Sequence, residues 1–236
     1  ILNDQNASSP TQSSPFLTTF IDSFAVRGGL RFNTEEPQLE GNFYEASNKP
    51  LLSELCIVSE YCDAGSLADI ASYVRKQRKA TSTTDHPVQV TQKEMAHICA
   101  SMVLGLTYMH SRHAVHRDIK TTNVLLTTNG HCKLMDFGIS TLSDKRNAFT
   151  RHNNNTLCGT PSYMAPEVIN AASLSGDKSS GEGYTEKADI WSLGVTAFEL
   201  AEGFTPANQS GTQACNPYFI MSSIVLGPEP HLSEEV

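Results

Sequence analysis

Three polar side chains of different chemistry lie close together in the stretch 116–123 of this 236-residue chain. Asp118 carries a carboxylate, Lys120 an ammonium group and Asn123 a side-chain amide. Transfer of a phosphoryl group needs a carboxylate to orient the attacking hydroxyl, a cation to neutralise the phosphoryl oxygens, and an oxygen ligand for a metal ion. The types and spacing of these residues therefore predict phosphoryl-transfer chemistry.

Further motifs follow in a fixed order along the chain. Asp136-Phe137-Gly138 offers a second carboxylate, suited to a metal that bridges nucleotide phosphates. Ala165-Pro166-Glu167 comes next, and 189–194 reads Asp-Ile-Trp-Ser-Leu-Gly. A single such motif is weak support. Together, in this order and at these intervals, they favour one fold strongly.

Two helices are expected to position these motifs. Thr91-Gln-Lys-Glu94 is a capping box that predicts a helix start. Apolar residues follow it at helical spacing, namely Met95, Ile98, Met102, Leu106 and Met109. A second helix is predicted over 189–202, with one apolar face made of Ile190, Leu193, Ala197 and Leu200.

Short strands are predicted around the polar stretch. Residues 124–126 and 132–134 read as a strand pair joined by the Asn129-Gly130 turn. Residues 15–24 and 51–61 are rich in β-branched and aromatic side chains, which also predicts strands. The polar segments predict surface loops, at 78–88, 173–183 and 205–216, together with a surface insertion at 25–50.

Composition restricts the class of protein. A formal charge of −8 argues against a nucleic-acid surface, and no apolar run is long enough for a membrane span. The six cysteines have no paired spacing, which is typical of reduced thiols and predicts a cytoplasmic protein. His110, His113 and His116 could suggest a metal site, but we expect helix-end and structural roles for them.

The motifs resemble those of eukaryotic protein Ser/Thr kinases over nearly the whole chain. The likeness is greatest to the sterile-twenty-like branch of the STE group, particularly the mammalian type, with the mitogen-activated kinase kinases second because their motifs overlap. The segments that carry it are IVSEYCDAGSLADI (57–70), HRDIKTTNVLL (116–126), GTPSYMAPEVI (159–169) and ADIWSLGVTAFELAEG (188–203).

The resemblance implies an α+β, bilobal kinase fold that holds ATP and Mg²⁺ between its lobes. Residues 1–60 would be a remnant of the small lobe, with the end of helix C, strands 4 and 5 and the insertion. Residues 61–236 would be the large lobe without its last helices. The partners would be protein substrates with Ser/Thr acceptors and an upstream kinase or a second copy.

The resemblance also implies roles for single residues. The catalytic group would be Asp118, Lys120, Asn123, Asp136 and Thr160, with Asn123 and Asp136 as metal ligands. Nucleotide contacts would come from Ser59, Glu60, Cys62, Ser66, Thr122 and Leu125, with the small Ser59 in the gatekeeper position. Structural roles fall to His116, Phe137, Gly138, Glu167 and Asp189, and Leu2, Phe20, His116 and Phe137 would form the regulatory spine.

Regulation is expected on the segment before Gly159. Thr156 aligns with the activating phosphosite of the family, and Arg117 would pair with an anion there. A solvated Thr in an Asn-rich loop is the alternative for Thr156.

Before residue 60 the sequence shows no Gly-rich phosphate loop, and its only lysine is Lys49. The strand-three lysine and helix-C glutamate are not found either. We therefore expect these 236 residues alone to be inactive or barely active. A pseudokinase or truncated scaffold that binds protein partners without catalysis is the alternative, although the intact Asp118, Lys120, Asn123 and Asp136 favour catalysis.

Overall fold

The computed structural model describes residues 14–27, 30–31, 52–80, 89–137, 141–142, 159–173, 185–209 and 216–233. The chain divides into two compact units. We term Thr18–Tyr61 the smaller unit, and Ile1–Leu17 together with Cys62–Val236 the larger unit. The predicted division after residue 60 falls near this boundary, and the assignment of the two parts as lobes stays a prediction.

The smaller unit contains an antiparallel sheet in which β1 (Phe20–Arg27) lies between β2 (Leu30–Arg31) and β3 (Leu52–Ser59). The strand predicted at 51–61 is confirmed as β3. The strand predicted at 15–24 is misplaced, because β1 begins at Phe20 and continues into the residues assigned to the insertion. Most of that insertion lies outside the described residues.

A turn at residues 14–17 explains the misplaced strand. The Leu17 amide donates to the Ser14 carbonyl at 3.2 Å, and the Phe16 amide donates to Ser14 Oγ at 3.3 Å. Pro15 occupies the second position of this turn, where its fixed φ is favourable. Leu17 is then buried in the larger unit, bridged to Leu134. Apolar composition alone does not reveal such a turn.

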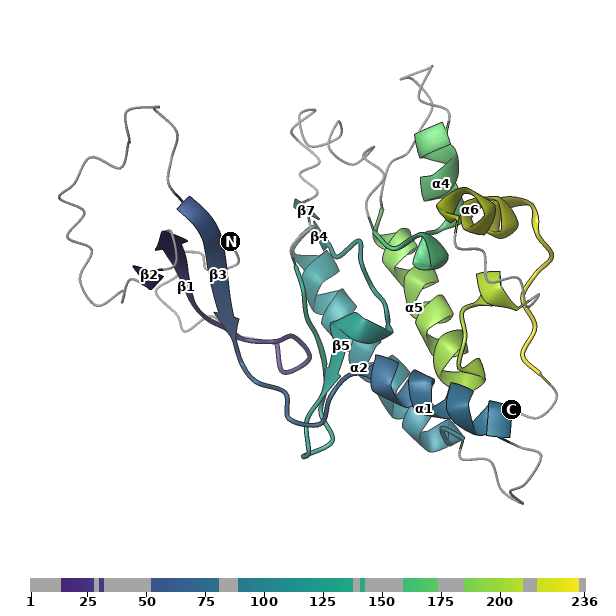
Figure 1. Ribbon diagram of the computed structural model, residues 1–236, viewed down its shortest axis with the longest axis horizontal. Helices are drawn as coiled ribbons and strands as arrows, with labels where there is room; N and C mark the ends of the chain where they lie inside the picture. The colour runs from purple at the N-terminus through teal and green to yellow at the C-terminus, as the bar shows by residue number, and fades with distance from the viewer. Residues whose placement is uncertain are drawn as a thin grey trace. The chain divides into compact units, whose positions relative to one another are not determined.

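The larger unit is built on three helices: α1 (Leu67–Ala80), α2 (Gln92–Ser111) and α5 (Glu186–Glu202). Both α1 and α2 pack against α5 (Figure 1). Their buried apolar side chains form one core with the strands that carry the polar stretch. Its members are Leu17, Leu67, Ala71, Ile98, Met102, Leu106, Met109, Ala114, Ile119, Val124, Cys132, Leu134 and Leu200.

The predicted capping box begins α2. Thr91 Oγ1 accepts the Glu94 amide at 3.3 Å, while the Glu94 carboxylate accepts the Thr91 hydroxyl at 2.7 Å and the Thr91 amide at 2.8 Å. These two donors hold the pKa of Glu94 below its usual value. Gly105 lets β6 (Cys132–Leu134) approach the helix, since an added Cβ would lie 2.9 Å from Leu134 Cδ1. Both the start and the buried face of this helix are confirmed.

Helix α1 corrects the predicted loop at 78–88, because the helix continues to Ala80. Asp69 caps its beginning by accepting the Ser66 amide and hydroxyl, each at 2.8 Å. At its other end Arg78 pairs with Glu202 of α5 at 2.7 Å. The polar residues near Arg78 suggested a loop, but this long-range ion pair fixes them in a helix. Residues 81–88 lie outside the described part.

Helix α5 begins at Glu186, ahead of the predicted start at 189. The predicted apolar face is wrong at its first member, because Ile190 is 51% exposed and Asp189 is 1% exposed. Asp189 turns inward because it accepts backbone amides of the polar stretch, as described below. Leu200, at the other end of that face, is fully buried as predicted.

The predicted strand pair is confirmed as β5 (Val124–Leu126) and β6 (Cys132–Leu134), which pair antiparallel. Gly130 closes their turn with a φ of 80°. A second small pair joins β4 (Ala114–Val115) to β7 (Thr141–Leu142). The remaining elements are the 3-10 turns η1 (Thr121–Asn123), η2 (Pro161–Tyr163) and η3 (Pro206–Asn208), and the helices α4 (Pro166–Ser173) and α6 (Pro217–Leu226).

Two predicted loops therefore need correction at their ends. Residue 173 belongs to α4, and η3 lies within 205–216. No helix in the described part of the chain is long and apolar enough to cross a membrane. Cys56, Cys62, Cys99 and Cys132 form no disulfide among the described residues, and these residues contain no group of three or more His, Cys, Asp and Glu that could hold a metal ion.

Candidate active site

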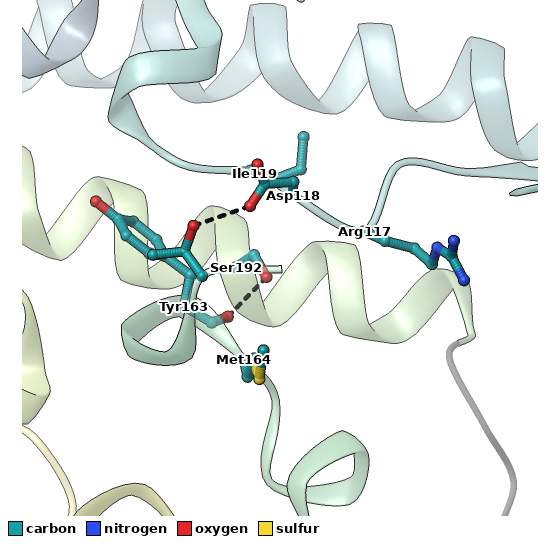
Figure 2. Close-up of a pocket in the computed structure, with 7 residues that line it drawn as sticks. Arg117, Asp118, Ile119, Tyr163, Met164 and Ser192 are labelled. Carbon is teal, nitrogen blue, oxygen red and sulfur yellow. Dashed lines mark hydrogen bonds between the residues drawn. The ribbon is translucent and has the colours of Figure 1, made fainter. Parts of the chain in front are cut away.

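The polar stretch of the sequence forms a hydrogen-bonded cluster around Asp118. Lys120 Nζ lies 2.6 Å from Asp118 Oδ2 and donates to Thr160 Oγ1 at 3.0 Å. Thr160 Oγ1 in turn donates to Asp118 Oδ1 at 3.0 Å (Figure 2). The three side chains are partly buried. A hydroxyl brought to this carboxylate would meet a fixed acceptor and a neighbouring cation.

Asn123 fixes the same carboxylate from the other side. Its Nδ2 donates to the Asp118 carbonyl at 2.8 Å and to Asp118 Oδ2 at 3.0 Å. Because both acceptors are oxygens, the amide nitrogen must face Asp118, which leaves Oδ1 as an acceptor or metal ligand. Thr122 Oγ1 donates to that oxygen at 3.4 Å. The 3-10 turn η1 thus orients Asn123 while it positions Asp118.

Asp136 lies beyond β6 with an exposed side chain and a φ of 64°. Left-handed backbone is uncommon for residues other than glycine and gathers at functional sites. The Met135 amide donates to the Asn123 carbonyl at 2.9 Å, so the two predicted metal ligands are carried on adjoining backbone.

His116 is a buried structural residue. Its Nε2 lies 3.0 Å from the Met135 carbonyl, and its Nδ1 lies 3.3 Å from the Asp118 amide nitrogen. A carbonyl partner requires a proton on Nε2 and an N–H partner requires a lone pair on Nδ1, which assigns the neutral ring. Burial accordingly lowers the pKa of His116. The ring also contacts Phe137, with centroids 5.5 Å apart.

Asp189 holds the backbone of this stretch. Its carboxylate accepts the amides of His116 and Arg117, each at 2.9 Å, and contacts His110 Nε2 at 2.8 Å. Arg117 has a φ of 69°, a left-handed conformation that costs free energy in a residue with a Cβ. The buried carboxylate of α5 therefore stabilises a strained turn directly before Asp118.

A small pocket adjoins the cluster. It is lined by Arg117, Asp118, Ile119, Thr160, Tyr163, Met164 and Ser192, and Figure 2 labels all of them except Thr160. Ser192 Oγ donates to the Tyr163 carbonyl at 2.8 Å. The pocket places a hydrogen-bonded carboxylate next to a surface formed by η2 and α5.

Comparison with known proteins identifies the family. The sequence profile of the protein kinase domain matches residues 42–229. The chain belongs to the protein kinase domain family. It is 43% identical over 154 residues to "Serine/threonine-protein kinase dst3" of Dictyostelium discoideum, covering 65% of this chain and 23% of that protein. It is 44% identical over 155 residues to "Serine/threonine-protein kinase cst-1" of Caenorhabditis briggsae, covering 65% and 26%.

These matches support the resemblance to sterile-twenty-like Ser/Thr kinases and the partial kinase fold. The chain spans about a quarter of the length of the curated relatives it matches. The roles of the single site residues stay predictions.

The remaining predicted kinase residues are distributed over several elements. Ser59 ends β3, and in the smaller unit Glu60 exchanges hydrogen bonds with Thr19 through its amide at 2.9 Å and its carboxylate at 2.8 Å. In the larger unit Cys62 is buried, and Ser66 bridges Leu125 of β5. Thr122 and Glu167 are exposed. Gly138, Thr156 and Leu2 lie outside the described residues, and Phe20 is 55% exposed.

The motifs did not indicate two neighbours of the hydrogen-bonded cluster around Asp118. Tyr163 and Thr121 are buried beneath it and share a carboxylate on α5. Both lie within the kinase-like segments 116–126 and 159–169, so the sequence did mark their neighbourhood. Their partner Glu199 lies on a helix far away in the sequence, and spacing alone does not connect them.

Proposed function

We propose that this protein is a sterile-twenty-like Ser/Thr kinase that transfers the γ-phosphoryl group of ATP to Ser or Thr hydroxyls of protein substrates. The observation that carries the proposal is the hydrogen-bonded set of Asp118, Lys120 and Thr160, braced by Asn123. It unites an acceptor for the hydroxyl proton and a cation for the phosphoryl oxygens, the two functions that this transfer requires.

The proposed reaction runs as an in-line displacement. The substrate hydroxyl oxygen forms a bond to the γ-phosphorus while the bond to the β–γ bridging oxygen breaks and ADP leaves. Asp118 orients the hydroxyl and takes its proton. Lys120 neutralises charge on the transferred group, and Thr160 holds both side chains in place.

Asn123 and Asp136 fit a magnesium ion. Mg²⁺ in nucleotide enzymes is held by one or two protein oxygens together with phosphate oxygens and water. One amide oxygen and one exposed carboxylate on adjoining backbone agree with that ligand set. Bound there, the ion would neutralise charge on the phosphates.

The nucleotide base would contact the segment at 59–62. By family likeness, the Glu60 carbonyl and the Cys62 amide would bind adenine, with Leu125 beneath it and Ser66 and Thr122 near the ribose. A serine at position 59 leaves space behind the base, so we expect sensitivity to adenine analogues that carry a bulky substituent.

Activation would depend on Thr156 and Arg117. A phosphate on Thr156 would pair with the guanidinium of Arg117, whose backbone Asp189 fixes. Replacing Thr156 with Ala in the complete protein should then abolish activation. Activation that persists in this variant would leave Thr156 as an ordinary loop residue.

The decisive experiment is a phosphoryl-transfer assay with radiolabelled ATP, Mg²⁺ and a generic protein substrate. It compares the complete native protein, residues 1–236 and Asp118→Asn. We expect Asp118→Asn to lower kcat by about a hundredfold or more while the fold is retained. Glu186→Gln, which removes an exposed carboxylate on α5, is the matched control and should change nothing.

Transfer to Ser and Thr that depends on Asp118 supports the proposal. If the folded, complete protein transfers no phosphoryl group, the proposal is wrong and the non-catalytic scaffold is favoured. In that case the protein would bind protein partners without catalysis.

A further inference from the structure

Three polar groups from three elements meet beneath the candidate active site. Thr121 of η1 and Tyr163 of η2 both donate their hydroxyl protons to Oε2 of Glu199 on α5, the Thr121 bond measuring 3.0 Å. The two hydroxyl oxygens lie 3.3 Å apart. Thr121 is 2% and Tyr163 9% exposed, so water does not readily replace either donor.

The protons of this group are fully used. Each hydroxyl has one proton and gives it to the same carboxylate oxygen. Burial and the neighbouring Glu199 raise the pKa of Tyr163, which keeps the phenol protonated and therefore a donor. Removing the Thr121 hydroxyl would leave the carboxylate with a single donor from this pair, and polar groups in such surroundings are costly to leave unpaired.

The position of the group gives it a role. Thr121 directly follows Lys120, and Tyr163 ends the turn that Thr160 begins. The bonds among Asp118, Lys120 and Thr160 join these same two segments at the surface, and the Glu199 group joins them again below. Ser192 secures the Tyr163 carbonyl from α5 (Figure 2).

We propose that Thr121 is a positioning residue for phosphoryl transfer, whose hydroxyl ties the catalytic loop to η2 through Glu199 and so holds Thr160 against Asp118 and Lys120. The inference rests on the proposed kinase function. Thr121 touches neither the substrate hydroxyl nor the nucleotide in this scheme. It acts through the geometry of the residues that do.

A plain core role is the rival explanation, and the chain offers a matched control for it. Thr196 is also fully buried and lies on α5, but its hydroxyl donates to the Ser192 carbonyl within its own helix. Thr121→Val and Thr196→Val each replace a buried hydroxyl with a methyl group of similar size. Only the first breaks a link between two segments of the site.

The test compares wild type, Thr121→Val, Thr121→Ser and Thr196→Val in the complete protein. We expect Thr121→Val to lower kcat roughly tenfold or more, because a small misplacement of reacting groups is costly. The KM for ATP should stay within about twofold, since uniform binding is untouched. Thr121→Ser restores the hydroxyl and should recover most of kcat, and Thr196→Val should keep it.

A second measurement does not depend on activity. The Tyr163 and Met164 amides bond within η2, to the Thr160 and Pro161 carbonyls. Hydrogen exchange at these amides should accelerate in Thr121→Val and return to wild-type rates in Thr121→Ser, with α2 unchanged in both.

The outcomes separate the two proposals. An inactive wild type defeats the proposed function, while exchange at η2 still decides whether the tether exists. Unchanged exchange at η2 or an unchanged kcat in Thr121→Val overturns the inference about Thr121. So does a loss of kcat in Thr121→Ser or in Thr196→Val that is as large as the loss in Thr121→Val.

Discussion

Two buried carboxylates stand at opposite ends of α5, and the protein satisfies them in different ways. Asp189 lies in the first turn and Glu202 is the last residue, and each is 1% exposed. The Asp189 carboxylate accepts the backbone amides of His116 and Arg117. The Glu202 carboxylate pairs with the guanidinium of Arg78 at 2.7 Å. One acid is held mainly by amide dipoles, the other by a full positive charge.

The helix dipole accounts for part of the difference. A negative charge is favourable near a helix N-terminus, where Asp189 lies, and unfavourable near the C-terminus, where Glu202 lies. Neutral donors therefore suffice for Asp189, whereas Glu202 needs a cation to offset its desolvation. The Ser233 amide adds a further bond to Glu202 at 2.6 Å.

The comparison teaches that burial of an acid does not by itself mark a functional site. The Asp189 end holds a left-handed Arg117 directly before Asp118, the proposed catalytic carboxylate. The Glu202 end joins α5 to α1 and to residue 233, both in regular or unstrained backbone. We therefore expect damage to Asp189 to affect stability and catalysis together, and damage to Glu202 to affect stability alone.

The largest effect should follow Asp189→Ala. Two backbone amides and the His110 ring would lose their common acceptor inside the protein. We expect the free energy of unfolding to fall by about 3–5 kcal/mol, as when one partner of a buried polar set is removed. Release of Arg117 should also lower the transfer rate by about a hundredfold. Urea unfolding and kcat per folded molecule measure the two effects.

Glu186→Ala is the control, because this acid lies in the same turn and is exposed. Its unfolding free energy should stay within about 0.5 kcal/mol of wild type. If Asp189→Ala has the same free energy of unfolding as this control, the amide bonds to Asp189 do not stabilise the protein. The proposed difference between the two ends of α5 would then be wrong.

A smaller effect is expected for Glu202→Gln. The amide keeps the volume and one acceptor oxygen but loses the charge opposite Arg78. We expect a loss of about 1.5–3 kcal/mol, the usual range for a hydrogen bond to a charged group. The kcat should remain within about twofold of wild type, since the site is held from the other end of α5.

Arg78→Gln and the double variant complete a cycle for this pair. A coupling energy close to zero would mean that the ion pair between Arg78 and Glu202 does not contribute to the free energy of unfolding. If kcat per folded molecule also fell in Glu202→Gln, both ends of α5 would hold the active site, and Glu202 would not act on stability alone.

Local signals made much of the larger unit predictable. The capping box of α2 and the Asn-Gly turn between β5 and β6 act over a few residues, and both are confirmed. The grouping of Asp118, Lys120 and Asn123 also lies within one short stretch. These features need no knowledge of distant chain segments.

Features with distant partners could not be found in this way. Arg78 lies in the last turn of a helix and pairs with an acid that is 124 residues away in the sequence. Asp189 turns inward to reach amides more than 70 residues earlier, which made the predicted apolar face wrong at Ile190. Thr121 meets Glu199 across 78 residues. Periodicity identifies a helix, whereas the side that it buries depends on the fold.

Acidification should weaken the Asp189 end selectively. Burial lowers the pKa of His116, so the folded protein resists a proton that the unfolded chain accepts below about pH 6.5. Stability from this group is therefore complete above that pH and is lost as the pH falls. One such histidine can remove up to about 1.4 kcal/mol between pH 7.5 and 5.5.

Urea unfolding of wild type, His116→Asn and Glu202→Gln at both pH values checks this. The pH dependence should shrink in His116→Asn, which has no titrating ring, and persist in Glu202→Gln. The carboxylates with lowered pKa do not interfere in this range, because Asp63, Asp69 and Glu94 titrate at still lower pH. A slope that survives in His116→Asn assigns the pH dependence to another group.

The smallest effect is expected between the two ends, at Gly194. An added Cβ there would have no atom within 4 Å, and a glycine inside a helix costs backbone entropy. Gly194→Ala should raise the free energy of unfolding by about 0.5–1 kcal/mol. The same change at Gly203, directly after Glu202, should have the opposite sign, because its φ is 78° and its Cβ would lie 2.7 Å from Arg75 Cα. If Gly203→Ala were stabilised as well, α1 would not need a glycine at this contact with α5. The ion pair of Arg78 with Glu202 would then be the main link between the two helices at this end.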